Sequence, residues 1–375
     1  MRLNTEHFLA RMSKSNLSEI AWLFLKLGIT GFGGPAAHTA MMRSEIVVKR
    51  KWFSDQHFLD MVGATNLIPG PNSTELAIHI GHERGGWKGL IIAGLCFVLP
   101  AVLITGILAW FYRQYGQLPE IQPFIYGIKP AIIAIILGAV FPLAQKSVKS
   151  LQLGFIGITV LILSFLGIGE IYLMFGAGLL LLLLNYSGTK TNSFFPLPLL
   201  VTVSETSLFL IFLKIGAILY GSGYVLFAFL DSELVATGIL SRQQLIDAIA
   251  VGQFTPGPLF SAVTFIGYQI SGLSGATLAT IGIFLPSFVF VAMLNPLVRK
   301  MRNSIRFSAF LDAVNVASIA IIAAVCIEMG KETIIDWKTL LIAALGAVVT
   351  FGSRKVNSAF VVLGGSVLGY LLTFI

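Results

Sequence analysis

Two lysines lie inside long apolar stretches of the chain, where a charged side chain is unusual. Lys26 and Lys214 each stand within such a stretch. An ammonium group inside a membrane segment is costly and usually faces the protein interior, at a substrate or ion pathway. A lysine can also reach the membrane interface or neutralise a buried carboxylate such as Asp60 or Asp247. The two lysines are therefore candidates for binding an anion, with a structural ion pair as the alternative.

The tripeptide Pro-Gly-Pro occurs twice, each time between short apolar runs that are typical of a helical hairpin broken inside a membrane. A helix that begins just after proline presents unpaired amide groups and the positive end of its dipole. Because these features favour anions, we expect an anion site at the two breaks. Its candidate groups are the break residues Pro69, Gly70, Pro71, Pro256, Gly257 and Pro258, the following amides of Asn72, Ser73, Thr74, Leu259, Phe260 and Ser261, and the side chains of Asn66, Gln253, Thr65, Thr255 and Ser261.

Other ionisable side chains near the first break could guide or couple transport. Glu75, His79 and His82 share one helical face, which suits a proton-coupling role for Glu75 or His79. The same spacing is compatible with a metal site or with a polar cavity wall. Arg43 and Arg50 could line a cytoplasmic entrance or anchor the topology. The entrance or coupling candidates are Arg43, Arg50, Asp60, Glu75, His79 and Asp247, and no resident metal or other cofactor is expected.

The composition indicates that these residues belong to an all-α polytopic membrane protein. Mean hydropathy is +0.88, and 56% of the residues are hydrophobic while 11% are charged. A soluble protein carries about a quarter charged residues. The formal net charge of +8 is spread over loops, which favours topology control and an anionic substrate over nucleic-acid binding. Cys96 and Cys326 lie in apolar runs and are interpreted as free core thiols.

The chain contains an internal duplication. We expect a first repeat over residues 1–186, a linker over 187–203 and a second repeat over 204–375. Each repeat is predicted to contain about five transmembrane helices plus one Pro-Gly-Pro broken hairpin. The matching residues are Lys26 with Lys214, Ser54 with Ser241, Gln56 with Gln243, Asp60 with Asp247, Asn66 with Gln253, the first Pro-Gly-Pro with the second, and Leu99-Pro100 with Leu285-Pro286.

The charges of the loops predict that the two repeats have inverted topology. An odd number of crossings per repeat turns the second repeat upside down. Residues 35–56 carry four Lys or Arg residues, whereas their counterparts at 223–242 carry Asp231, Glu233 and one arginine, Arg242. Because Lys and Arg collect in cytoplasmic loops, residues 35–56 are predicted to be cytoplasmic. This scheme places the charged N-terminus outside. Inverted repeats with broken helices are typical of transporters that open alternately to either side.

The chain contains a distinctive set of motifs: Gly31–His38, the basic stretch that ends at Trp52, the two broken hairpins, Tyr220–Tyr224 and Gly282–Phe288. Together these motifs resemble the chromate ion transporter family. The resemblance covers nearly the whole chain, in the long two-repeat form. It implies transport of chromate, with sulfate as a related oxyanion. It also implies that the glycine-rich turns contribute to the substrate site, together with the breaks, Arg50 and Trp52; the glycines concerned are Gly33, Gly34, Gly221 and Gly223.

The repeats predict alternating access, and the resemblance implies that the protein is a secondary active exporter of chromate across the inner, cytoplasmic membrane. Uptake of sulfate or a related oxyanion would share every feature above. A membrane-embedded enzyme acting on a lipid would need a nucleophile or metal constellation, for which Glu75, His79 and His82 are the candidates; no enzyme activity is expected. The expected partners are the oxyanion and the lipid bilayer, without nucleic acid, and a homodimer is compatible with the sequence.

Overall fold

The structure, a computed structural model, describes residues 17–32, 34–184, 205–221, 223–302, 305–352 and 356–374. Within these ranges the chain forms helices and no strand, as predicted. Residues 1–16, Gly33 and the predicted linker at 187–203 lie outside the described residues. The helices are α2 (Leu17–Thr30), α3 (Gly34–Arg43), the π-helical segment η1 (Ser44–Lys49), α4 (Asp55–Thr65), α5 (Asn72–Tyr115), α6 (Gln122–Ser147), α7 (Leu151–Phe165), α8 (Glu170–Leu184), α9 (Glu205–Ile218), α10 (Val225–Leu230), the π-helical segment η2 (Asp231–Val235), α11 (Arg242–Phe254), the 3₁₀ segment η3 (Leu259–Ser261), α12 (Ala262–Arg302), α13 (Ile305–Thr333), α14 (Trp337–Phe351) and α15 (Ser358–Leu372).

Both Pro-Gly-Pro tripeptides interrupt helices, as the sequence predicts. Helix α4 ends at Thr65 and α5 begins directly after Pro71. In the second repeat α11 ends at Phe254 and the chain becomes helical again directly after Pro258. The central glycines have φ values of +130° at Gly70 and +92° at Gly257. Residues with side chains rarely adopt this region, which explains why glycine stands between the two prolines.

A second pair of glycines folds each long helix back on itself. Helix α5 is bent sharply at Gly86, where φ is +58°, and α12 at Gly272, where φ is +62°. Along a straight helix Gly81 and Gly89 would stand about 12 Å apart. In the structure the backbones of Gly81 and Gly89 approach so closely that a Cβ fits on neither glycine. Each break is thus followed by a short helix that reverses direction into a longer one, as predicted for a broken hairpin followed by a full span.

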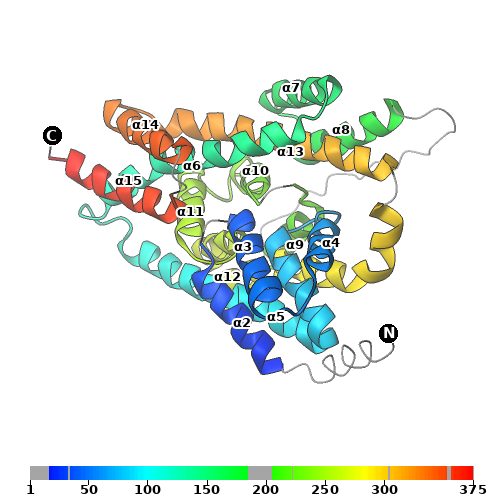
Figure 1. Ribbon diagram of the computed structural model, residues 1–375. Coiled ribbons are helices and arrows are strands. Elements are labelled where there is room, and N and C mark those ends of the chain that lie inside the picture. Colours follow the sequence, from blue (N-terminus) through cyan, green and yellow to red (C-terminus); the bar gives the residue numbers. More distant parts are fainter. Residues whose placement is uncertain are drawn as a thin grey trace, which may run out of the picture.

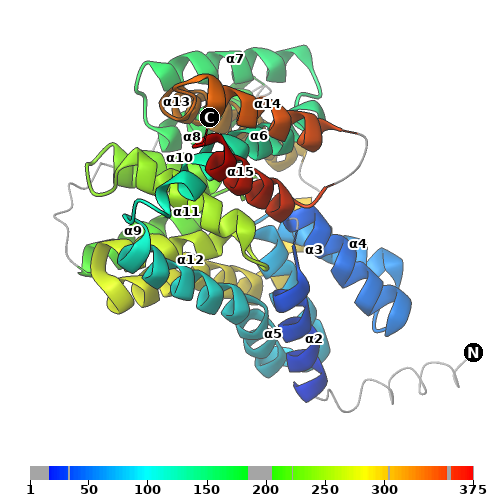
Figure 2. The same cartoon turned by 90° about the vertical axis from the view of Figure 1, so that its left-hand side faces the viewer.

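The helices form two groups, which both views separate (Figures 1 and 2). The break group contains α2, α3, α4, α5, α9 and α12, and the exchange group contains α6, α7, α8, α13, α14 and α15, with α10 and α11 between them. In the exchange group, α6 of the first repeat packs against α14 and α15 of the second, and α13 of the second packs against α7 and α8 of the first. Helices of the two repeats are thus exchanged within this group.

Four of the described helical stretches are long and apolar enough to cross a membrane. They are Asn72–Tyr115, Gln122–Ser147, Leu259–Met293 and Ser308–Thr333. The runs predicted as further full spans form shorter helices. Helices α7, α8, α14 and α15 have 15 residues each, which gives a length of about 22 Å against a hydrocarbon thickness of about 30 Å. These four helices nevertheless coincide closely with four of the apolar runs in the sequence.

The two stretches expected to be polar loops are also helical. Residues 35–56 contain α3 and η1, and residues 223–242 contain α10 and η2. Every residue of α10 is buried. These stretches are rich in charge although they are helical, because their charged residues lie near the ends of the short helices and form ion pairs.

Candidate functional site

The two Pro-Gly-Pro breaks are joined crosswise to the two repeats. The amide of Gly70 donates a hydrogen bond to the carbonyl of Leu219 over 2.8 Å, and the amide of Gly257 donates to the carbonyl of Gly31 over 2.7 Å. Gly31 and Leu219 follow the ends of α2 and α9, the first described helix of each repeat. Each break therefore docks on the unwound end of the other repeat's first helix, which brings the glycine-rich turns and the breaks together.

A buried carboxyl group lies beside the first break. Glu75, in the first turn of α5, is fully buried, and its Oε1 accepts a hydrogen bond from Ser287 of α12 over 3.3 Å. Its other oxygen, Oε2, has no hydrogen-bond partner among the described residues. A Cβ at Gly70 would come within 2.8 Å of Ser287 Oγ and closer still to Glu75. The break thus encloses an ionisable side chain with spare hydrogen-bonding capacity.

The second break is lined by hydroxyl groups and an amide instead of a carboxyl group. Ser261 is buried and accepts a hydrogen bond of 3.4 Å from Thr105 of α5. A Cβ at Gly257 would come within 2.8 Å of Ala101, one turn before Thr105. Gln253 is buried, and its Nε2 has no partner among the described residues. Gly223 faces Leu259 and Phe260 of this break, whereas Gly221 faces Asn315 and Ser318 of α13.

Two of the amides expected to be free for an anion are already engaged. The amide of Thr74 donates to the carbonyl of Pro71 over 2.7 Å, and the amide of Ser261 donates to that of Pro258 over 3.0 Å. These tight first turns close on the proline carbonyl, so the prediction of three free amides per helix was wrong. Asn72 and Ser73 remain at the first break, where the side chain of Asn72 also donates to Asn66 over 2.6 Å. The hydroxyls of Thr65 and Thr255 donate to backbone carbonyls of their own helices, over 3.0 and 3.3 Å.

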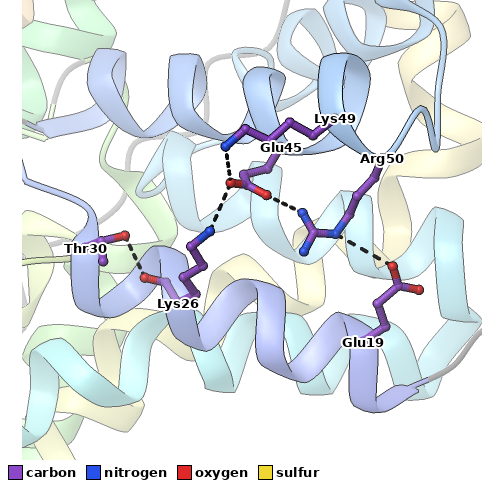
Figure 3. Close-up of polar contacts among 6 residues, drawn as sticks. All are labelled: Glu19, Lys26, Thr30, Glu45, Lys49 and Arg50. Carbon is purple, nitrogen blue, oxygen red and sulfur yellow. Dashed lines mark hydrogen bonds and ion pairs between the residues drawn. The ribbon is translucent and has the colours of Figure 1, made fainter.

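Lys26 belongs to a cluster of charges around Glu45, drawn in Figure 3. Glu45 of η1 receives Lys26 Nζ at 3.1 Å and Lys49 Nζ at 2.8 Å on one oxygen, and Arg50 on the other. Glu19 extends the cluster, 3.7 Å from Arg50. The hydrogen bond from Lys49 and those from Lys26 and Arg50 lower the pKa of Glu45 to about 2, against the opposing effect of burial.

Lys214 forms the matching contact in the second repeat. Its Nζ lies 2.5 Å from Glu233 of η2, and Glu45 and Glu233 each follow their lysine by 19 residues. The lysine side chains are 46% and 45% exposed. The structure thus pairs Lys26 with Glu45 and Lys214 with Glu233, and the alternative pairing with Asp60 or Asp247 was wrong. That prediction looked for a carboxylate in the hairpins, whereas the partners lie in the π-helical segments.

A further ion pair occurs in both repeats with its charges reversed. Arg43 contacts Asp55 at 2.6 Å in the first repeat, and Arg242 contacts Asp231 at 3.0 Å in the second. The acid and the base have exchanged places between the end of the short helix and the start of the hairpin. Both repeats therefore keep an ion pair between the same two elements, although the acidic and basic residues are exchanged. The net charge of the two stretches can thus differ between the repeats without loss of this ion pair. Arg242 also reaches Glu328 and Glu332 of α13.

The hairpin carboxylates occupy different surroundings in the two repeats. Asp247 is buried and receives the hydroxyl of Tyr112 at 2.6 Å and the ammonium of Lys129 at 3.5 Å. Asp60, its counterpart, receives Gln56 at 3.3 Å on the exposed side of α4. Lys129 and Tyr112 were missed by the sequence reasoning. A lysine within the apolar run of α6 was the available signal, of the same kind that drew attention to Lys26.

Glu75, His79 and His82 do not converge on a common point. Glu75 contacts Ser287, His79 lies 3.9 Å from Glu83, and the ring of His82 packs against Trp87. Across the described ranges no group of three or more His, Cys, Asp or Glu side chains is arranged to hold a metal ion. The three side chains share one helical face, but each of them contacts a different partner.

The two hairpins also differ in how they are enclosed. Leu59 of α4 is 50% exposed, whereas Ile246, its counterpart in α11, is completely buried. Helix α11 packs against α6 and α15 of the exchange group, whereas α4 packs mainly against α3, α5 and α12. The repeats are therefore related in sequence but stand in two different arrangements.

Comparison with known proteins shows which protein family this chain resembles. The sequence profile of the family described as "Chromate transporter" matches residues 18–182 and 206–370. A protein of Synechococcus elongatus named "Probable chromate transport protein" is 31% identical over 95% of this chain and 95% of its own length. A "Chromate transport protein" of Cupriavidus metallidurans is 31% identical over 94% of this chain and 92% of its own. That of Pseudomonas aeruginosa is 29% identical over 93% and 91%.

No solved structure matches the chain. The family profile matches the chain twice and leaves residues 183–205 between the two matches. The apolar helices and the two matches of the family profile both fit a two-repeat helical membrane protein. The chain belongs to the chromate transporter family, whose members are multi-pass membrane transporters and not enzymes.

Proposed function

We propose that this protein is a secondary active transporter that exports chromate across the cytoplasmic membrane by alternating access. The observation that carries this proposal is the reciprocal docking of the two breaks, through Gly70 on Leu219 and Gly257 on Gly31. Irregular backbone at membrane depth persists only where protein or a polar path satisfies it. Relatives over nearly the full length are named for chromate transport, which supports chromate as the substrate.

The unequal hairpins support the mechanism. A twofold-related pair that stands in two arrangements can exchange them, so that α4 takes the enclosed position and α11 the exposed one. Such an exchange would open a central site first to one side of the membrane and then to the other. The reciprocal backbone hydrogen bonds hold the breaks during this exchange, because each repeat supplies one donor and one acceptor.

Polar groups at the breaks are suited to a tetrahedral dianion. At the first break the substrate would meet the turn of Asn72 and Ser73, and at the second it would meet Gln253 and Ser261. Lys26 and Lys214 would supply positive charge at the ends of α2 and α9, and Arg43 and Arg50 would attract the anion at one entrance. Glu75, buried beside the first break, would carry a proton as the coupling group, because an unpaired carboxylate is costly at that depth.

The proposal is tested in a bacterium that lacks its own chromate exporters. Cells that produce the protein should accumulate less chromate than cells with an empty vector and should tolerate more of it. Gly257→Ala should abolish the difference, because the new Cβ would press on Ala101. Gly63→Ala is the matched control, since a Cβ at Gly63 meets nothing within 4 Å. If the cells accumulate more sulfate while their chromate content is unchanged, the protein imports sulfate and does not export chromate.

A further inference from the structure

The cluster around Asp247 joins the two repeats away from the breaks. Asp247 lies on α11, and its two oxygens are approached by Tyr112 of α5 and Lys129 of α6, both from the first repeat. Lys129 also donates to Gln243, one turn before Asp247, over 2.7 Å. The side chain of Asp247 is 6% exposed and that of Lys129 is 20% exposed. Asp247 precedes Thr255 by eight residues, or about 12 Å along the helix axis.

The donors in this cluster are those that an oxyanion requires. An ammonium group and a hydroxyl group converge on one carboxylate, and a tetrahedral dianion presents oxygens to donors in a similar way. The bound carboxylate belongs to the hairpin that would move during transport. When α11 leaves α6, Lys129 loses its counter-charge in a partly buried position, which is costly until another anion arrives.

The repeat provides a natural comparison. The residue that corresponds to Lys129 in α13 is Asn315, at the offset that also relates Leu99 to Leu285. Lysine is thus present at only one of the two positions that the repeat relates, which favours a specialised role over a requirement of the fold.

Two cavities border residues that lie one helical turn from Asp247 and Lys129. One of about 370 Å³ is lined by Thr237–Leu240, Gln244, Gln269 and Ile270, and Gln244 lies one turn before Asp247. Another of about 590 Å³ borders Gln122 and Tyr126, and Tyr126 lies one turn before Lys129. Both volumes exceed the roughly 30 Å³ occupied by one water molecule in the liquid.

We propose that Lys129 and Tyr112 form an oxyanion-binding subsite that the Asp247 carboxylate occupies while no substrate is bound. The inference rests on the proposed function and names a substrate contact that lies outside the breaks. It makes Asp247 an internal competitor of the substrate. Neutralising Asp247 and neutralising Lys129 should therefore change oxyanion affinity in opposite directions, which a merely structural ion pair would not do.

The test measures binding of radiolabelled sulfate to the purified full-length protein, together with the sulfate dependence of flux in proteoliposomes. Asp247→Asn should lower the half-saturating sulfate concentration about tenfold, the effect of one charge-assisted hydrogen bond. Lys129→Gln should raise it by about the same factor, and Lys129→Arg should stay near the wild type. Tyr112→Phe should weaken binding less than Lys129→Gln does.

The exposed ion pair between Lys149 and Asp312, 2.7 Å apart, provides the matched control. Lys149→Gln and Asp312→Asn should leave both readouts unchanged. Weaker sulfate binding in Asp247→Asn, or equal binding in Asp247→Asn and Lys129→Gln, overturns the subsite while wild-type flux still supports the proposed function. A wild-type protein that neither binds nor moves sulfate or chromate refutes the proposed function itself, and the subsite with it.

Discussion

Removing the charge of Glu45 tests whether the cluster drawn in Figure 3 stabilises the first repeat. The substitution Glu45→Gln keeps the size of the side chain and leaves Lys26, Lys49 and Arg50 without their shared counter-charge. Because Glu45 is 6% exposed, water replaces the lost carboxylate poorly. We expect a less stable protein in which the side chain of Lys26 is released from η1.

The magnitude follows from the lowered pKa of Glu45. Each pKa unit corresponds to about 1.4 kcal/mol, so the fall from 4.5 to about 2 corresponds to about 3 kcal/mol. Lys26 and Lys49 are 46% and 60% exposed, and solvent screens their attraction. The expected loss is therefore reduced to about 1–2 kcal/mol in the free energy of unfolding.

The assay is thermal unfolding of the purified protein in detergent at several pH values. The stabilisation is complete above pH 4.5, the ordinary pKa of the group, and is lost as the pH falls toward about 2, because the folded protein then binds the proton that the unfolded chain already holds. The wild type should therefore unfold at a higher temperature than Glu45→Gln at pH 7. The difference should shrink steadily below pH 4.5.

Glu233→Gln is the internal control, since Glu233 contacts one lysine, Lys214, where Glu45 contacts two lysines and an arginine. It should lower the unfolding temperature less than Glu45→Gln does. Equal unfolding temperatures for Glu45→Gln and the wild type at pH 7, or a difference that persists unchanged to pH 3, would refute the reasoning.

Three further predictions follow from named contacts. Gly70→Ala should reduce chromate flux at least about tenfold while Gly63→Ala does not, because a Cβ at Gly70 meets Ser287 and Glu75; equal fluxes in proteoliposomes would contradict the packed break. Lys26→Gln and Lys214→Gln should each abolish flux without loss of membrane insertion, measured on matched amounts of protein. Normal flux in both variants would mean that the two lysines have only a structural role. The double variant Arg43→Asp, Asp55→Arg exchanges the two charges. It should regain the unfolding temperature that either single variant loses, since Arg242 and Asp231 form the same ion pair with the charges reversed.

The features that could be predicted from sequence are those set by local backbone chemistry. Proline and glycine determine where α4 and α11 stop and where α5 and η3 start, so Pro69–Pro71 and Pro256–Pro258 were informative without any partner. The fold class followed from hydropathy. The positions of α7, α8, α14 and α15 followed from it too, because each helix coincides closely with one apolar run.

The ion pairs depend on segments that are distant in sequence, which local rules do not bring together. Lys129 and Asp247 are 118 residues apart and meet through the exchange of helices between repeats. One signal was nevertheless present: Glu45 and Glu233 stand at the same spacing after Lys26 and Lys214. The repeat concealed Lys129, because its counterpart is Asn315.

The central claim is that an oxyanion crosses the membrane through this protein. The most direct measurement is the flux of labelled chromate in proteoliposomes, with sulfate as competitor and with an imposed pH gradient. We predict chromate flux that sulfate inhibits, that the pH gradient drives and that Gly70→Ala removes. Sulfate flux without chromate flux would contradict the assigned substrate, and the absence of flux of either anion in well-folded wild-type protein would contradict the account.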